Sequence, residues 1–217
     1  MTINKIDKYL LLFSSFIEGG ALMAVEILSS KIISPYYGTS LYVWAAILGI
    51  TMGGLALGYF LGGHLSLSEK KSQLKILLLI FAISSFFVWL IPHSAFWIMK
   101  NTLIFEIRVG IIVSCIFFLL PPIVSFGLVT PMTIRLLAKN KTTIGFTSGL
   151  VYTISTIGGI MATFLTGFFL ISKIGVIATV NSISISLMIP PVMFGLISVF
   201  KYLKKIPQIN PTNNIAD

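Results

Sequence analysis

The chain has 217 residues, of which 56% are hydrophobic and only 10% charged, and its mean hydropathy is +1.01. A soluble domain needs far more polar surface than this, so the composition predicts an integral membrane protein. The net charge of +9 does not indicate a nucleic-acid partner. The basic residues stand in small groups between hydrophobic runs, as they do in the cytoplasmic loops of membrane proteins.

Six hydrophobic runs are long enough to cross a bilayer, since about 20 apolar residues span its core. The predicted spans are residues 9–33, 41–63, 74–91, 109–129, 144–171 and 176–200. The segment 93–108 contains Phe96 and Trp97 and predicts an interfacial helix that lies on the membrane between the third and fourth spans. We expect residues 1–203 to form one membrane domain and residues 204–217 a disordered polar tail.

The first hydrophobic run follows Lys5 and Lys8, as the apolar part of a secretory signal peptide would. However, it is longer than such a segment, it contains two glutamates, and no convincing cleavage site ends it. We therefore interpret it as a retained first span.

The distribution of Lys and Arg predicts the orientation. With the N-terminus inside, the inner segments hold 11 of the 15 basic residues and the outer segments hold 4. This excess favours cytoplasmic N- and C-termini and an even number of spans, in a membrane of the bacterial cytoplasmic (inner) type.

Two spans carry glycines at a spacing that is typical of helix packing. Gly54, Gly58 and Gly62 recur every four residues in the second span, and Gly158 and Gly159 lie in the fifth. Small residues at such positions let the backbone of another helix approach closely. We expect both sets to be helix-packing surfaces.

Prolines interrupt the fourth span and the segment after it, at Pro121, Pro122 and Pro131. A proline removes a backbone donor and kinks a helix. In a membrane the freed carbonyl groups need other partners, so broken helices tend to line a cavity or pack on protein. Two interpretations stay open for these prolines, a simple kink and a gate or cavity wall.

Two of the six acidic residues, Glu18 and Glu26, lie within the first span. Glu18 is about 15 Å along the helix from Lys8, near the bilayer centre, and Glu26 is about 12 Å further on. Eight helical steps separate their directions by about 80°, so both can face one cavity. Acids inside a membrane usually face the bundle interior and serve a pathway, a proton relay or a counter-ion.

No Lys or Arg lies at mid-membrane depth to neutralise Glu18. We therefore predict a cation-binding site formed by Glu18 and Glu26 together with Tyr152 and Ser155 of the fifth span. A phenol at this depth needs a hydrogen-bond partner, and its ring offers a cation–π surface.

The sequence predicts no metal site, no cofactor and no catalytic site. Cys115 is the one cysteine, and His64 and His93 are far apart, so no Cys/His metal spacing exists. There is no glycine-rich phosphate loop and no Ser/His/Asp set. The enzyme alternative that remains is one acting on a lipid within the membrane, and no paired catalytic set is visible for it.

Residues 22–63 contain an acid, a basic residue five positions later, a Pro-x-x-Gly-x-Ser turn and a glycine-rich span. These positions are Glu26, Lys31, Pro35, Gly38, Ser40 and residues 58–63. This pattern resembles the membrane region of the fused MFS/spermidine-synthase family. The runs "PPIVSFGLVTPMTIRL" and "GFTSGLVYTISTIGGIMATFLTGFFLISKIG" are similar to that family too, so the resemblance covers about residues 10–175.

Three features depart from the family pattern. Lys31 stands where members commonly have arginine, and the loop "HLSLSEKK" lacks their Asp-Arg pair. The soluble aminopropyltransferase-like domain that many members carry is not part of this chain. The resemblance implies a stand-alone, half-MFS-like bundle linked to polyamines. Because transporters of that superfamily usually have twelve helices, it also implies a homodimer.

We therefore expect an all-α integral membrane protein with six transmembrane helices. It is expected to be transporter-like and to bind or move a small organic cation, with a polyamine suspected, through a cavity lined by intramembrane carboxylates. The alternative is a non-transporting membrane anchor or regulatory subunit for a separate soluble aminopropyltransferase, which would bind the inner loops 64–75 and 135–143. The expected partners are the cation, the lipid bilayer and a second copy of the chain, with no nucleic acid.

Overall fold

The computed structural model describes residues 5–67, 70–138 and 140–203. In these ranges every regular element is a helix, as the composition predicts. The elements are α1 (Lys5–Tyr37), α2 (Leu41–Leu65), α3 (Lys70–Thr102), α4 (Ile107–Phe118), α5 (Leu120–Leu137), the 3₁₀ helix η1 (Lys141–Thr143), α6 (Ile144–Phe164), the π-helix η2 (Leu165–Leu170) and α7 (Ile171–Leu203). The predicted C-terminal tail, 204–217, lies outside the described residues.

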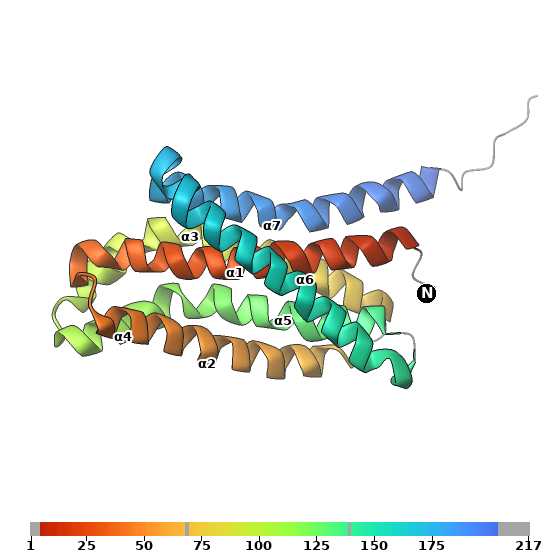
Figure 1. Cartoon of the computed structure of the whole chain (residues 1–217), viewed down its shortest axis with the longest axis horizontal. Coiled ribbons are helices and arrows are strands. Elements are labelled where there is room, and N and C mark those ends of the chain that lie inside the picture. The colour runs from red at the N-terminus through yellow and green to blue at the C-terminus, as the bar shows by residue number, and fades with distance from the viewer. Residues whose placement is uncertain (1–4, 68–69, 139, 204–217) are drawn as a thin grey trace, which may run out of the picture.

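The helices run back and forth along the long axis of one elongated bundle (Figure 1). α1 begins and α7 ends at the same end of this bundle. α1 is the central helix, because it contacts each of the other α-helices and most of its apolar length is buried. Residues that point outward from α1 therefore meet protein on several sides, and polar groups placed there need partners within the bundle.

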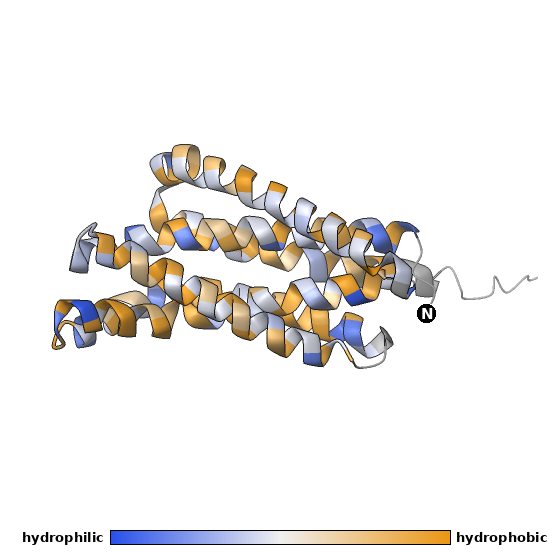
Figure 2. Cartoon of the chain, turned by 60° about the horizontal axis from the view of Figure 1, so that its bottom comes forward, coloured by the Kyte–Doolittle hydropathy of each residue, from blue (hydrophilic) through white to orange (hydrophobic). Residues whose placement is uncertain are grey.

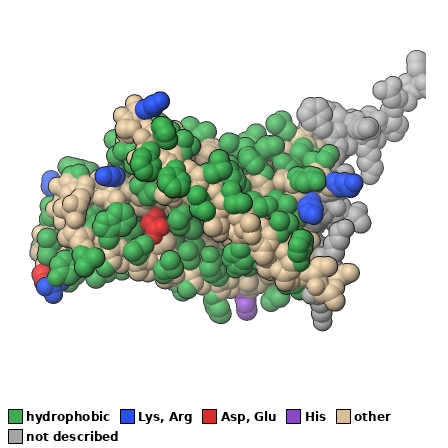
Figure 3. Space-filling model, viewed as in Figure 1, with side chains coloured by type: hydrophobic (Ala, Val, Ile, Leu, Met, Phe, Trp, Pro, Cys, Tyr) green, Lys and Arg blue, Asp and Glu red, His purple; other side chains and the backbone are tan. Residues whose placement is uncertain are grey.

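Five helical stretches are long and apolar enough to cross a membrane. They are Lys5–Tyr37, Leu41–Leu65, Ser72–Thr102, Leu120–Leu137 and Ile144–Ser198. Hydrophobic side chains cover most of the visible surface (Figure 3), and hydrophilic residues gather mainly near the two ends of the bundle (Figure 2). The structure thus confirms an all-helical chain of long apolar helices, as in a membrane protein.

The last of these stretches, Ile144–Ser198, is longer than one membrane crossing requires. It contains Gly175, whose φ of 81° and ψ of 171° are not helical. A residue with a side chain rarely adopts this φ, so glycine permits the reversal here. α6 and α7 therefore run in opposite directions on either side of this point (Figure 1).

The predicted interfacial helix 93–108 is not a separate element. α3 continues through Pro92 to Thr102, so the prediction that Pro92 ends the third helix is wrong. Proline removes one backbone donor, and the next side chains bond back to the preceding turn. His93 Nδ1 lies 2.9 Å from the carbonyl oxygen of Trp89, and the Ser94 hydroxyl donates to that of Leu90. The carbonyl group that loses its helical donor is that of Val88, so the helix passes Pro92 at the cost of one backbone bond.

The predicted fourth span, 109–129, consists of two helices. α4 ends at Phe118 and α5 begins at Leu120, so the break falls just before Pro121 and Pro122. Neither proline can donate to the preceding turn, which explains the break there. Pro131 interrupts nothing, since α5 runs on to Leu137.

The glycines of α2 lie on two different faces. Gly54, Gly58 and Gly62 face α5, and a Cβ on Gly58 would lie 2.5 Å from the carbonyl oxygen of Val124. Gly49 and Gly53 have nothing within 4 Å of such a Cβ. The first set fixes how closely α2 and α5 pack, whereas the second leaves a smooth strip on the outside of the bundle.

The close α2–α5 contact predicts a large difference between two alanine substitutions in one helix. Gly58→Ala should destabilise the protein by about 1 to 3 kcal/mol, because the new methyl group has no space. Gly63→Ala, where nothing lies within 4 Å, should be neutral or slightly stabilising. Thermal unfolding of the purified protein in detergent measures both effects, and equal shifts would contradict the packing.

Candidate binding site between α1, α2 and α6

α1 and α6 touch through their backbones. A Cβ on Gly19 would collide with the carbonyl oxygen of Ser155, and one on Gly158 would collide with that of Phe16. Gly159 adds to the same contact, where its Cβ would lie 2.9 Å from Cγ of Met23. These glycines bring the middle of α1 against the middle of α6, and side chains next to them are held face to face.

Glu18 is buried at this contact, with 2% of its surface exposed. The hydroxyl of Ser155 donates a hydrogen bond of 3.2 Å to Glu18 Oε2. No basic side chain in the described part of the chain forms an ion pair with Glu18. An ionised acid in apolar surroundings is costly without a basic partner, so the Ser155 bond is a significant contact for Glu18.

A cavity of about 320 Å³ lies between α1, α2 and α6. Glu18 does not line it, but its neighbour Gly19 and its hydrogen-bond donor Ser155 do. Its lining residues are Gly19, Leu22, Met23, Tyr59, Tyr152, Ser155, Thr156, Gly159, Ile160, Thr163 and Phe164. The hydroxyl groups come from α2 and α6, and the α1 wall is formed by glycine and apolar side chains. Tyr59 lies close enough to Glu18 and Tyr152 to interact electrostatically with both. The contact of the carboxyl group across α1 and α6 is therefore the Ser155 hydroxyl, and the two tyrosines belong to the cavity wall.

Of the predicted binding residues, Ser155 is hydrogen-bonded to Glu18 and lines the cavity together with Tyr152. Glu26, like Glu18, does not line the cavity, and it has no bond to a residue that does. Glu26 is 9% exposed, and Thr51 of α2 is close to its carboxyl group. Glu26 Oε1 and Thr51 Oγ1 are both buried, yet neither meets the geometry of a hydrogen bond.

Sequence reasoning missed Tyr59, Thr51, Thr156 and Thr163. The glycine-rich second span was interpreted only as a packing surface. The tyrosine within it, a polar group inside an apolar run, could have indicated a binding residue. Which face of that helix Tyr59 occupies depends on how α2 is rotated against α1. The glycines at 54, 58 and 62 could have fixed this rotation once α5 was known to be their partner.

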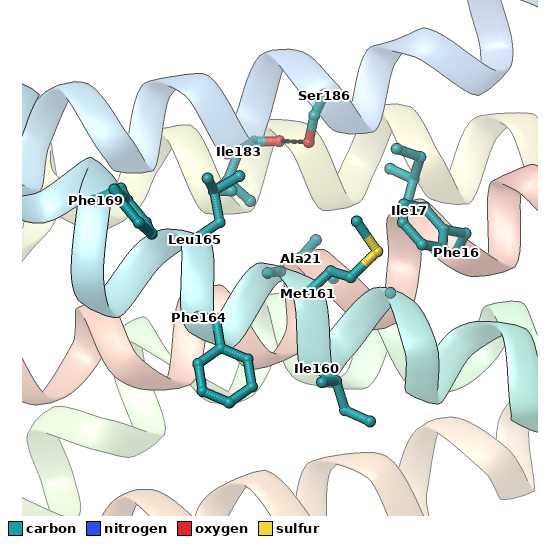
Figure 4. Close-up of a pocket in the computed structure, with 13 residues that line it drawn as sticks. Phe16, Ile17, Ala21, Ile160, Met161, Phe164, Leu165, Phe169, Ile183 and Ser186 are labelled. Carbon is teal, nitrogen blue, oxygen red and sulfur yellow. Dashed lines mark hydrogen bonds between the residues drawn. The ribbon is translucent and has the colours of Figure 1, made fainter.

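A larger cavity of about 520 Å³ lies between α1, α6, η2 and α7 (Figure 4). Its wall is almost entirely apolar and includes Phe16, Met161 and Leu165. The hydroxyl group of Ser186 is already used, since it donates a 2.7 Å bond to the carbonyl oxygen of Ile183. This cavity suits hydrocarbon, so the smaller cavity beside Glu18 is the candidate site for polar chemistry.

A scan against protein-family models, a search of curated proteins and a search of solved structures each find no match for this chain. Among the described residues, no group of three or more His, Cys, Asp and Glu side chains is placed to hold a metal ion. The candidate site therefore depends on the geometry of α1, α2 and α6.

The Glu18–Ser155 bond predicts a specific stability effect. Ser155→Ala should destabilise the protein by about 1 to 3 kcal/mol, because a buried carboxyl oxygen loses its donor. Ser182→Ala is the matched control, since Ser182 is exposed and bonds only to its own helix at Ala178. Thermal unfolding in detergent compares them, and an equal effect of the two substitutions would show that the bond contributes nothing.

Proposed function

We propose that this protein binds a small organic cation at Glu18 and moves it across the membrane. The observation that carries the proposal is a buried carboxyl group with no basic partner, beside a cavity lined by hydroxyl groups. A carboxylate binds an ammonium group by charge and hydrogen bonding, and tyrosine rings add cation–π attraction. Glu18 supplies the first, and Tyr59 and Tyr152 supply the second.

The two kinds of cavity wall suit the two parts of such a ligand. Tyr59, Tyr152 and Ser155 surround the position for an ammonium group, whereas Leu22 and Met23 offer an apolar surface for its carbon chain. Polyamines have this composition, and the resemblance to the MFS/spermidine-synthase family makes them the first molecules to test.

The proposed topology has six crossings. α4 is short of a full crossing, so α4 and α5 are taken to cross as one unit interrupted at Leu119. The stretch Ile144–Ser198 is taken to cross twice, with its reversal at Gly175. The two termini then lie on the same side, which the excess of Lys and Arg assigns to the cytoplasm.

The proposed active unit is a homodimer. The cavity beside Glu18 is open on one side, and Tyr152 at its edge is 49% exposed. In a bilayer that edge would place a phenol against lipid, and a second copy would cover it. The smooth strip formed by Gly49 and Gly53 lets another helix approach α2.

The carboxylate role predicts the outcome of a binding experiment. Purified protein in detergent should bind radiolabelled putrescine or spermidine, and Glu18→Gln should weaken binding by about 10- to 100-fold, because a charge-assisted bond is lost. Glu106→Gln is the control, since Glu106 is exposed at the start of α4. Equal affinity in wild type and Glu18→Gln would refute the site.

Movement and assembly need a separate measurement. The protein reconstituted in liposomes should take up the labelled amine, and Glu18→Gln should abolish the uptake. Its mass in nanodiscs should correspond to two copies, and Gly49→Trp should yield one copy with α2–α5 packing intact. Binding without uptake would exclude a transporter and favour a membrane anchor for a soluble aminopropyltransferase. A single copy in the wild type would exclude the dimer.

A further inference from the structure

A third cavity, of about 240 Å³, lies at the end of the bundle where α1 and α6 begin (Figure 1). It is lined by Lys8 of α1, Leu137 of α5, and Thr143, Phe146, Thr147 and Leu150 at the start of α6. The last four of these recur at intervals of three and four residues, so they form one face of a helical segment. The cavity is therefore built where three helices meet.

The crossing of α1 and α6 explains why there is space here. The two helices touch through Gly19 and Gly158, near the middle of the bundle. They run in the same general direction and diverge from that crossing toward the end where both begin (Figure 1). The cavity lies in the wedge between them, and Leu137 of α5 forms part of its wall.

The order of the groups along the cavity follows the depth profile of one bilayer leaflet. Lys8 is about 16 Å along α1 from Gly19, at the expected bilayer centre, and half of the hydrocarbon core is about 15 Å thick. The ammonium group therefore lies at the depth of the lipid phosphate groups. Leu150 is about 10 Å further along α6 than Thr143, toward the crossing with α1. The apolar part of the wall thus lies at the depth of the acyl chains.

The charge at the cavity is positive. Lys8 is exposed, and in the described part of the chain no acid forms an ion pair with it. The neighbouring acid, Asp7, is 8% exposed and does not line the cavity. The Thr143 hydroxyl donates to the carbonyl oxygen of Asn140, so Thr147 is the lining hydroxyl that can donate to a ligand. The first turns of α6 add the positive end of its helix dipole.

We propose that this cavity holds one anionic phospholipid from the leaflet that surrounds this end of the bundle. The lipid phosphate accepts a charge-assisted bond from the Lys8 ammonium group and a hydrogen bond from the Thr147 hydroxyl. One acyl chain lies against Phe146 and Leu150, in the wedge between α1 and α6. A free phosphate ion would use the same polar groups but would leave this apolar wall without a partner. Basic pockets between membrane helices commonly bind acidic head groups on the cytoplasmic side, where the proposed topology puts this end.

Lipid retention tests the proposal. Protein purified in detergent is mixed with phosphatidylglycerol or with phosphatidylcholine, which has a phosphate group but no net charge, and native mass spectrometry counts the bound lipid. One phosphatidylglycerol per chain should be retained about fivefold more tightly than phosphatidylcholine, because the Lys8 ammonium group attracts a net negative charge. Equal retention of the two lipids would overturn the proposal.

Variants locate the lipid. Lys8→Gln should remove the preference for phosphatidylglycerol. Arg135→Gln is the matched control and should keep it, since Arg135 is exposed near the same end of α5 as Leu137 but does not line the cavity. Equal effects of these two substitutions would show a general attraction to the basic end and would overturn the site. Leu150→Trp fills the wedge and should weaken retention, and unchanged retention in this variant would contradict the placement of the chain.

Inorganic phosphate separates the two sources of the anion. At millimolar concentration it should leave the retained phosphatidylglycerol in place. Displacement of the lipid by inorganic phosphate, but not by chloride, would assign the cavity to a free anion and overturn the proposal. None of these measurements involves an amine, so their outcome is independent of the proposed cation site at Glu18.

Discussion

The contact between α1 and α6 is the constraint on which the candidate site depends. Gly19 and Gly158 let the two backbones touch, and no side chain could replace either hydrogen without moving a helix. The contact is made by van der Waals packing, since apolar surfaces gain little from each other in lipid. This contact places Ser155 beside Glu18, and the Ser155 hydroxyl stabilises the acid. If α1 and α6 were further apart, Glu18 would have no such donor.

The α2–α5 contact supplies the other wall. Gly58 lies against Gly127 of α5, which fixes the rotation of α2 about its own axis. That rotation turns Tyr59 toward Glu18 and Thr51 toward Glu26. Packing glycines and polar residues therefore act together in this protein. The α2 glycines Gly54, Gly58 and Gly62 contact α5, yet they decide which α2 side chains face α1.

The helices were predictable because hydropathy is a local property of the sequence. Glu18 and Ser155 were both predicted as binding residues, but their meeting joins positions 137 residues apart and required the tertiary structure. The end of the third helix was predicted wrongly at Pro92, because a proline removes one backbone bond and α3 continues past that loss to Thr102. Tyr59 was missed since its orientation depends on α5, a helix that follows it by some sixty residues.

The buried acids of α1 have a consequence for the order of events during synthesis. At the centre of a membrane helix an acidic residue costs about 2.5 to 3.5 kcal/mol on the insertion scale, whereas each Leu, Ile, Val or Phe gains about 0.3 to 0.6 kcal/mol. The twelve such residues between positions 9 and 33 give about 4 to 7 kcal/mol, which roughly balances two glutamates. The donor for Glu18 is 137 residues downstream and emerges about 7 to 27 seconds later. We therefore expect the free energy of inserting the first helix alone to be close to zero. Its Glu18 gains a hydrogen-bond donor only when α6 has been synthesised.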